Sequence, residues 1–161
     1  GGMLHPVTAL EHLVPILGLG LLAGQQGSSA ARWVLLLFPL GLLVGTLIAG
    51  NAEPNLWVEW FNRLSFIAIG LLIAISVRLP PPLLVTVAVI LGLSHGYENT
   101  VDISSAVAMH LFVPGVIVTG VAMIAIFAAI SVSRESAWQK IAVRVVGSWI
   151  AAIGILILGV T

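Results

Sequence analysis

The chain has 161 residues, of which 60% are hydrophobic and only 7% are charged. A soluble domain carries about 25% charged residues, so this composition cannot supply a water-facing surface. The six Lys and Arg residues are balanced by six Asp and Glu residues, and this lack of a basic excess argues against nucleic acid as a partner. The absence of cysteine excludes disulfides, thiolate metal sites and cysteine nucleophiles. We therefore predict a polytopic membrane protein.

Apolar runs long enough to cross a bilayer as helices alternate with polar or proline-containing breaks. We predict an all-α fold, a single domain over 1–161 that forms a bundle of six transmembrane helices. The strict alternation of a membrane β-barrel is absent. The expected spans lie at roughly 6–26, 32–50, 60–78, 82–102, 105–131 and 138–160.

The breaks between these spans have distinct chemistry. Residues 25–29 and 51–55 form polar turns, and the second precedes an aromatic cluster suited to a membrane interface, Trp57, Trp60 and Phe61. Residues 80–82 are three consecutive prolines, which we expect to form a stiff loop without helix. Similar glycine-containing segments recur at 20–24, 41–45 and 70–74, and small residues of this kind let helices pack closely. Gly92 and Gly96 likewise permit the close approach of a neighbour to the fourth span.

The charges are segregated between alternate loops. The basic residues of one set of loops are Arg32, Arg78, Arg134, Lys140 and Arg144, and the acidic residues at the opposite span ends are Glu11, Glu53, Glu59, Glu98 and Asp102. Only Arg63 and Glu135 fall outside this pattern, and Arg63 is assigned no role. The positive-inside rule then predicts cytoplasmic basic loops and two outward termini, in a protein of the bacterial inner membrane.

All four histidines, His5, His12, His95 and His110, lie in the outer halves of their predicted spans. Polar and ionisable side chains inside a membrane are costly, so their positions are the best indication of function. Glu11, Glu98 and Asp102 lie at the same level as the histidines. This level of the bundle is where we expect the functional site.

The fourth predicted span places His95, Glu98, Asn99 and Asp102 at i, i+3, i+4 and i+7, on one stripe of a helix. An imidazole with two carboxylates is a suitable ligand set for a divalent cation such as Ni²⁺, Co²⁺ or Zn²⁺. The alternative is that these groups are the solvated end of a helix, which explains Asp102 more readily than His95. Asn99 is expected to be a hydrogen-bonding partner or a cap.

The first span adds His5 and His12, whose spacing of seven residues returns them to nearly the same helix face. His5 could instead cap the chain end. Glu11 points about 100° away from His12 and could orient an imidazole without binding the metal itself. On the fifth span, His110 could either contribute to the site or hydrogen-bond a neighbouring helix.

Two of these segments resemble the HupE/UreJ family, hydrogenase and urease accessory membrane proteins thought to be nickel or cobalt permeases. His5-Pro6-x-x-Ala9-x-Glu11-His12 is similar to the family's first-span pattern His-Pro-x-x-Gly-x-Asp-His. Leu91-Gly92-x-Ser94-His95-Gly96-x-Glu98 is similar to its fourth-span pattern His-Gly-x-Ala-His-Gly-x-Glu. The family's six spans and its outward N-terminus after signal removal also match.

The resemblance implies a metal-binding role for His12, His95 and Glu98, and less directly for His5 and Glu11. Three of the departures from the family pattern bear on the site. Ala9 replaces Gly, Glu11 replaces Asp, and Leu91 stands where the family has its first fourth-span histidine, so one ligand is missing. Asp102 or His110 could substitute for it.

The leading hypothesis is a permease that binds a divalent transition-metal cation, nickel or cobalt, at an outer His/carboxylate site and carries it inward. The metal is then the substrate, and no organic cofactor is expected. The alternatives are a non-transporting scaffold within a larger membrane complex and an intramembrane zinc-dependent hydrolase. The partners expected are the lipid bilayer, the metal ion, and other complex subunits or a metallochaperone.

Overall fold

The computed structural model describes residues 10–50, 52–101 and 109–160, which form six helices and no strand. The helices are α2 (Leu10–Gln26), α3 (Ser28–Ala49), α4 (Leu56–Ala74), α5 (Pro81–Val101), α6 (Met109–Val132) and α7 (Ala137–Val160). The predicted all-α class is confirmed, and each predicted span overlaps one helix. Four of these helices, α3, α4, α6 and α7, are long and apolar enough to cross a membrane.

The structure corrects three of the predicted breaks. Pro81 and Pro82 begin α5 and do not lie in a loop, because the first turn of a helix needs no amide hydrogen from its first residues. The predicted turn at 25–29 consists of Gly27 alone, because α2 ends at Gln26 and α3 begins at Ser28. Gly27 has a φ of 105°, which favours a residue without a side chain. α4 begins four residues before its predicted start, with the Asn55 side chain accepting a hydrogen bond from the Trp57 amide as its N-cap.

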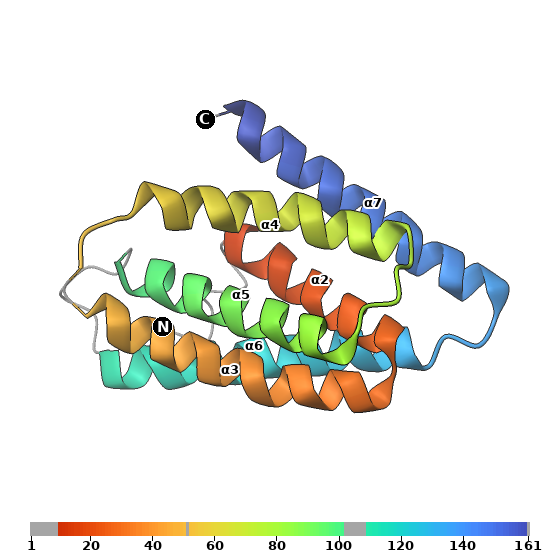
Figure 1. Ribbon diagram of the computed structural model, residues 1–161, viewed down its shortest axis with the longest axis horizontal. Helices are drawn as coiled ribbons and strands as arrows, with labels where there is room; N and C mark the ends of the chain where they lie inside the picture. Colours follow the sequence, from red (N-terminus) through yellow and green to blue (C-terminus); the bar gives the residue numbers. More distant parts are fainter. Residues whose placement is uncertain (1–9, 51, 102–108, 161) are drawn as a thin grey trace.

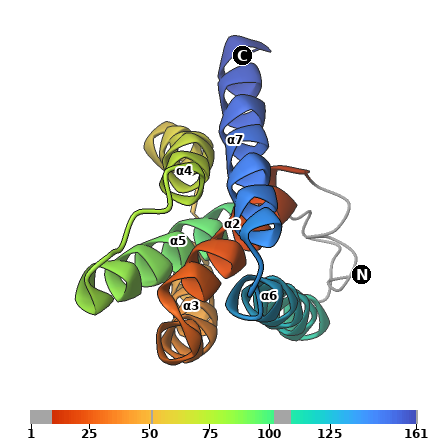
Figure 2. The same ribbon diagram turned by 90° about the vertical axis from the view of Figure 1, so that its right-hand side faces the viewer.

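The helices pack as three close pairs, α3 with α5, α4 with α7 and α2 with α6. α2 is the central helix and contacts each of the other five (Figures 1 and 2). Its side chains at Leu19, Leu22 and Ala23 are fully buried. α7 runs obliquely across α4 on one side of the bundle (Figure 1). The exposed surfaces of the five outer helices, α3 to α7, are rich in large apolar side chains, as a lipid-facing surface requires.

Glycines set the close approach of α3 and α5. Gly41 and Gly45 of α3 face Gly92 and Gly96 of α5, and a Cβ atom on any of the four would meet backbone atoms of the other helix. Side chains can move aside, but the backbone of a packed helix cannot do so without separating the pair. The predicted role of these glycines in helix packing is thus confirmed, and it fixes α5 against α3.

A methyl group at this contact should weaken the fold. In Gly45→Ala the new Cβ would overlap the Leu93 carbonyl, and overpacking of this kind costs about 1–3 kcal/mol. The matched control is Gly120→Ala, whose Cβ would lie 3.5 Å from Phe38 Cε1, an ordinary contact. Thermal unfolding in detergent should show a lower midpoint for Gly45→Ala and none of this loss for Gly120→Ala. Equal midpoints would contradict the packing described.

The C-termini of α2 and α6 meet at one end of the bundle, where Arg134 joins them. Its guanidinium donates to the carbonyl oxygens of Gly24 and Gln25 at 3.4 and 3.3 Å, and also to the Ser131 carbonyl. Burial, and secondarily the nearby positive charge of Arg78, lower the pKa of Arg134 below its usual range. A guanidinium nevertheless stays charged, so it neutralises the negative ends of both helix dipoles.

The C-terminus of α4 lies at the same end. Gln25 Nε2 donates to the Ile73 carbonyl at 3.1 Å, and Arg144 Nε donates to the Ala74 carbonyl at 2.8 Å. Arg32, Arg78 and Lys140 also belong to this basic end, and Glu53, Glu59 and Glu98 lie at the opposite, acidic end. For the described residues, the predicted partition of charges therefore corresponds to two ends of one bundle.

Candidate metal centre

Buried polar side chains of the described residues gather at the acidic end. Six of them lie there, on α3, α4 and α5: Thr46, Asn62, Ser65, His95, Asn99 and Thr100. The other two, Gln25 and Ser131, lie at the basic end and bond to helix carbonyls. Because burying a polar group without compensation costs free energy, a cluster of this size at one level indicates a functional region.

Glu98 is the charged member of this region. Its Oε2 accepts a hydrogen bond from Asn62 Nδ2 at 2.5 Å, which ties α5 to α4. Glu98 also lines a pocket of about 250 Å³, whose wall is built from the start of α4 and the end of α5. The carboxylate is therefore both anchored to a buried amide and adjacent to a space that a hydrated cation could enter.

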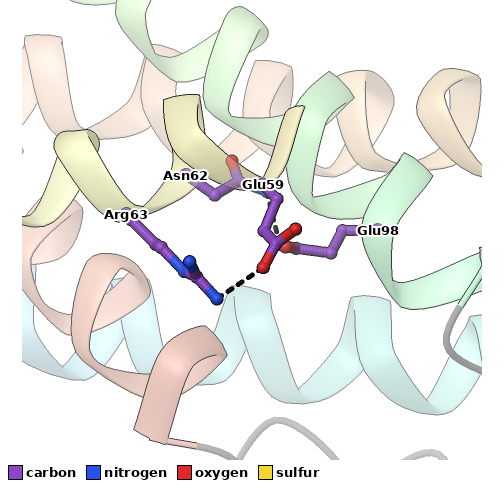
Figure 3. A network of polar contacts seen from close by, with 4 residues as sticks. All are labelled: Glu59, Asn62, Arg63 and Glu98. Carbon is purple, nitrogen blue, oxygen red and sulfur yellow. Dashed lines mark hydrogen bonds and ion pairs between the residues drawn. The ribbon is translucent and has the colours of Figure 1, made fainter. Parts of the chain in front are cut away.

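A second carboxylate, Glu59, lines the same pocket (Figure 3). It forms an ion pair with Arg63 one turn further along α4, and the Arg63 guanidinium lies 5.9 Å from the centre of the Trp60 ring. Arg63, which the sequence left outside the charge pattern, thus has a local role. It is a fixed positive charge on the same α4 stripe as Glu59 and Asn62, and it offsets one of the two negative charges of the pocket.

His95 lies one turn from Glu98, toward the bundle interior, and only 1% of its surface is exposed. The neighbouring Gly96 carbonyl accepts hydrogen bonds from the Thr46 and Thr100 hydroxyls, at 3.3 and 2.8 Å. Three residues of the predicted stripe, His95, Glu98 and Asn99, lie in the described part of α5. They differ in exposure, because His95 and Asn99 are buried inside the bundle and Glu98 is half-buried beside α4.

The remaining predicted ligands are placed only in part. His5 and Asp102 lie outside the described residues, and Glu11 and His12 lie in α2 but their side chains are not among those described. His110 is exposed on the first turn of α6. Among the described side chains, no three of the types His, Cys, Asp and Glu come together as a metal site. The complete ligand set therefore stays a prediction.

Sequence reasoning missed Asn62, and it gave Glu59 and Arg63 no part in the site. The signal was present, because Glu59, Asn62 and Arg63 stand at i, i+3 and i+4 inside an otherwise apolar helix. The cost of polar groups in a membrane that drew attention to His95 and Glu98 applies equally to Asn62.

Comparison with known proteins gives a consistent result. A family model described as HupE / UreJ protein matches residues 1–157. The chain is 26% identical over 159 residues to a protein of Rhizobium leguminosarum bv. viciae named Protein HupE. The aligned region covers 98% of this chain and 82% of that protein. No solved structure matches the chain significantly.

Proposed function

The chain belongs to the HupE/UreJ family, and we propose that it is a membrane permease for a divalent transition-metal cation, nickel or cobalt. The family is linked to nickel and cobalt handling, which agrees with the imidazole and carboxylate groups at the acidic end. In this proposal the acidic end faces outward, all six helices cross the bacterial inner membrane, and the metal is the transported substrate.

The observation that carries the proposal is the position of Glu98. It joins a pocket of about 250 Å³ to the buried polar region that contains His95. Imidazole and carboxylate ligands suit nickel, cobalt and zinc, and bind them less tightly than a closed thiolate cage would. A carrier needs such moderate affinity, since a bound ion must also leave. In the proposed site, His12, His95 and Glu98 are the core ligands.

The way inward is less polar. Between the acidic and basic ends, the described helices contain no Asp, Glu or His side chain that is buried. At the inner edge of the acidic end, Ser65 and Thr46 are buried, and their hydroxyls donate to the Asn62 and Gly96 carbonyls. We propose that the cation leaves the site past such hydroxyl and carbonyl oxygens when the helices at the basic end move apart.

Two other functions make different demands. A scaffold of a larger membrane complex would bind no metal and would purify together with partner proteins, a possibility favoured by Leu91 at the position of a family histidine. A zinc-dependent hydrolase would turn over lipid in detergent and would need three ligands around an open coordination position.

Elemental analysis of the purified protein, with and without chelator treatment, tests the binding part of the proposal. We expect nickel or cobalt supplied during purification to be retained at one ion per chain and to be removed by chelator. A protein that retains none of nickel, cobalt or zinc at micromolar free concentration would support the scaffold instead.

The proposed orientation can be tested by cysteine labelling, because the chain has no cysteine of its own. Ser29 and Ser133 are exposed near the basic end, and Ala52 is exposed at the acidic end. In intact cells we expect Ala52→Cys to react with a membrane-impermeant maleimide, and Ser29→Cys and Ser133→Cys to react only with a permeant one. Labelling of either serine position by the impermeant reagent would overturn the topology.

A further inference from the structure

Asn62 lies on α4 one turn after Glu59, which lines the pocket, and it is 3% exposed. Its Nδ2 donates to Glu98 Oε2 at 2.5 Å, and its backbone carbonyl accepts a hydrogen bond from Ser65 Oγ at 2.6 Å. A carboxamide buried in an apolar helix is unfavourable unless its polar atoms are satisfied. The bond to Glu98 satisfies the nitrogen.

The oxygen of the same carboxamide is not satisfied. Within the described residues, Asn62 Oδ1 is buried and has no hydrogen-bond partner. Because Nδ2 points at a carboxylate, the amide cannot be reversed without placing two acceptor oxygens against each other. Figure 3 shows the oxygen turned away from the Glu98 carboxylate. A buried acceptor of this kind is rare in native proteins and indicates a place for water or another donor.

The contact between α4 and α5 is not closely packed along its whole length. Two further cavities, of about 380 and 270 Å³, are lined by residues of both α4 and α5. The smaller one is apolar and is lined by Leu91 of α5 and Ser65 of α4, among others. The hydrogen bond between Asn62 and Glu98 therefore ties α4 to α5 along a contact that also contains two cavities.

We propose that Asn62 is a positioning residue of the divalent-cation site. Its Nδ2 holds one oxygen of Glu98 in a fixed place, and its Oδ1 accepts a hydrogen bond from a water molecule carried by the cation. The inference rests on the proposed function and adds a residue that neither the family patterns nor the predicted ligand set contains.

The test is isothermal titration of Co²⁺ into the purified full-length chain, combined with thermal unfolding with and without Co²⁺. Asn62→Leu should weaken Co²⁺ binding about 10- to 100-fold, the usual effect of removing a group that orients a metal ligand. The matched control is Gln25→Leu, which also removes a buried carboxamide that bonds across to α4, but at the basic end. It should lower the unfolding midpoint by a similar amount and leave Co²⁺ affinity within about twofold of wild type, since that residue is far from the proposed ligands.

A second variant decides the matter if Asn62→Leu does not fold. Asn62→Asp places a carboxylate against Glu98, so the metal-free protein should unfold at a lower temperature than wild type. If the cation binds beside this position, Co²⁺ should raise the unfolding midpoint of Asn62→Asp more than that of wild type, because bound cation neutralises the repulsion. An equal or smaller Co²⁺ effect would overturn the inference.

The experiment distinguishes failure of the permease proposal from failure of the role given to Asn62. If the wild-type chain binds no Co²⁺, both the proposed function and this inference are wrong. If wild type binds Co²⁺ and Asn62→Leu binds it equally well, the permease proposal stands and the role of Asn62 is wrong.

Discussion

Glu98→Gln should reduce cation uptake by roughly 100-fold or more and leave the fold intact. Removing a residue that only orients a metal ligand costs about 10- to 100-fold in affinity, so removing the charge of a direct ligand should cost at least as much. The fold should survive because a glutamine oxygen can still accept the hydrogen bond from Asn62 Nδ2. Uptake by proteoliposomes that contain a metal-sensitive dye measures the first effect, and thermal unfolding measures the second.

Glu53→Gln is the matched control, because Glu53 lies in the exposed loop at the same end. The Glu53 backbone carbonyl accepts a hydrogen bond from the Tyr97 hydroxyl at 2.8 Å, and a change of the side chain preserves this bond. This variant should transport at nearly the wild-type rate. Arg63 is not a suitable control, since it is paired with Glu59 in the pocket. Uptake by Glu98→Gln at the wild-type rate would exclude Glu98 as a ligand.

The double variant His12→Ala/His95→Ala should lose its bound metal. Two of the three proposed core ligands are then absent, and the remaining carboxylate is a weak site by itself. His95 is almost completely buried, so its replacement by alanine also leaves a cavity and lowers stability. His12→Ala/His95→Gln fills more of that volume and separates the two effects.

The measurement for both double variants is metal content per chain after equilibration with Ni²⁺ or Co²⁺. We expect both to fall well below the content of wild type, and His12→Ala/His95→Gln to unfold closer to the wild-type temperature. A folded double variant with unchanged metal content would show that the cation binds elsewhere.

The architecture followed well from the sequence because its determinants are local or periodic. Helix positions follow from apolar length, and close helix contacts follow from glycines such as Gly41 and Gly45. The main error was the proline run, where Pro81 and Pro82 start α5. Proline disrupts the interior of a helix but suits its first turn, and composition alone does not tell these positions apart.

The candidate site could be predicted only along single helices. Helical periodicity placed His95 and Glu98 close together, but it carries no information on which neighbouring helix Glu98 faces. The pairing of Glu98 with Asn62 depends on how α4 and α5 pack, at a separation of 36 residues in the chain. Asn62 was overlooked and Arg63 was assigned no role for that reason, although both stand out as polar residues within an apolar helix.

The central claim is that this protein moves a divalent transition-metal cation across the bilayer, and flux into proteoliposomes tests it most directly. Vesicles containing the wild-type chain and an internal metal-sensitive dye would receive Ni²⁺, Co²⁺ or Zn²⁺ outside, beside vesicles without protein. We expect uptake above that of the empty vesicles for Ni²⁺ or Co²⁺, and its loss in Glu98→Gln. Wild-type vesicles with no more flux than empty ones for all three ions would contradict the permease function.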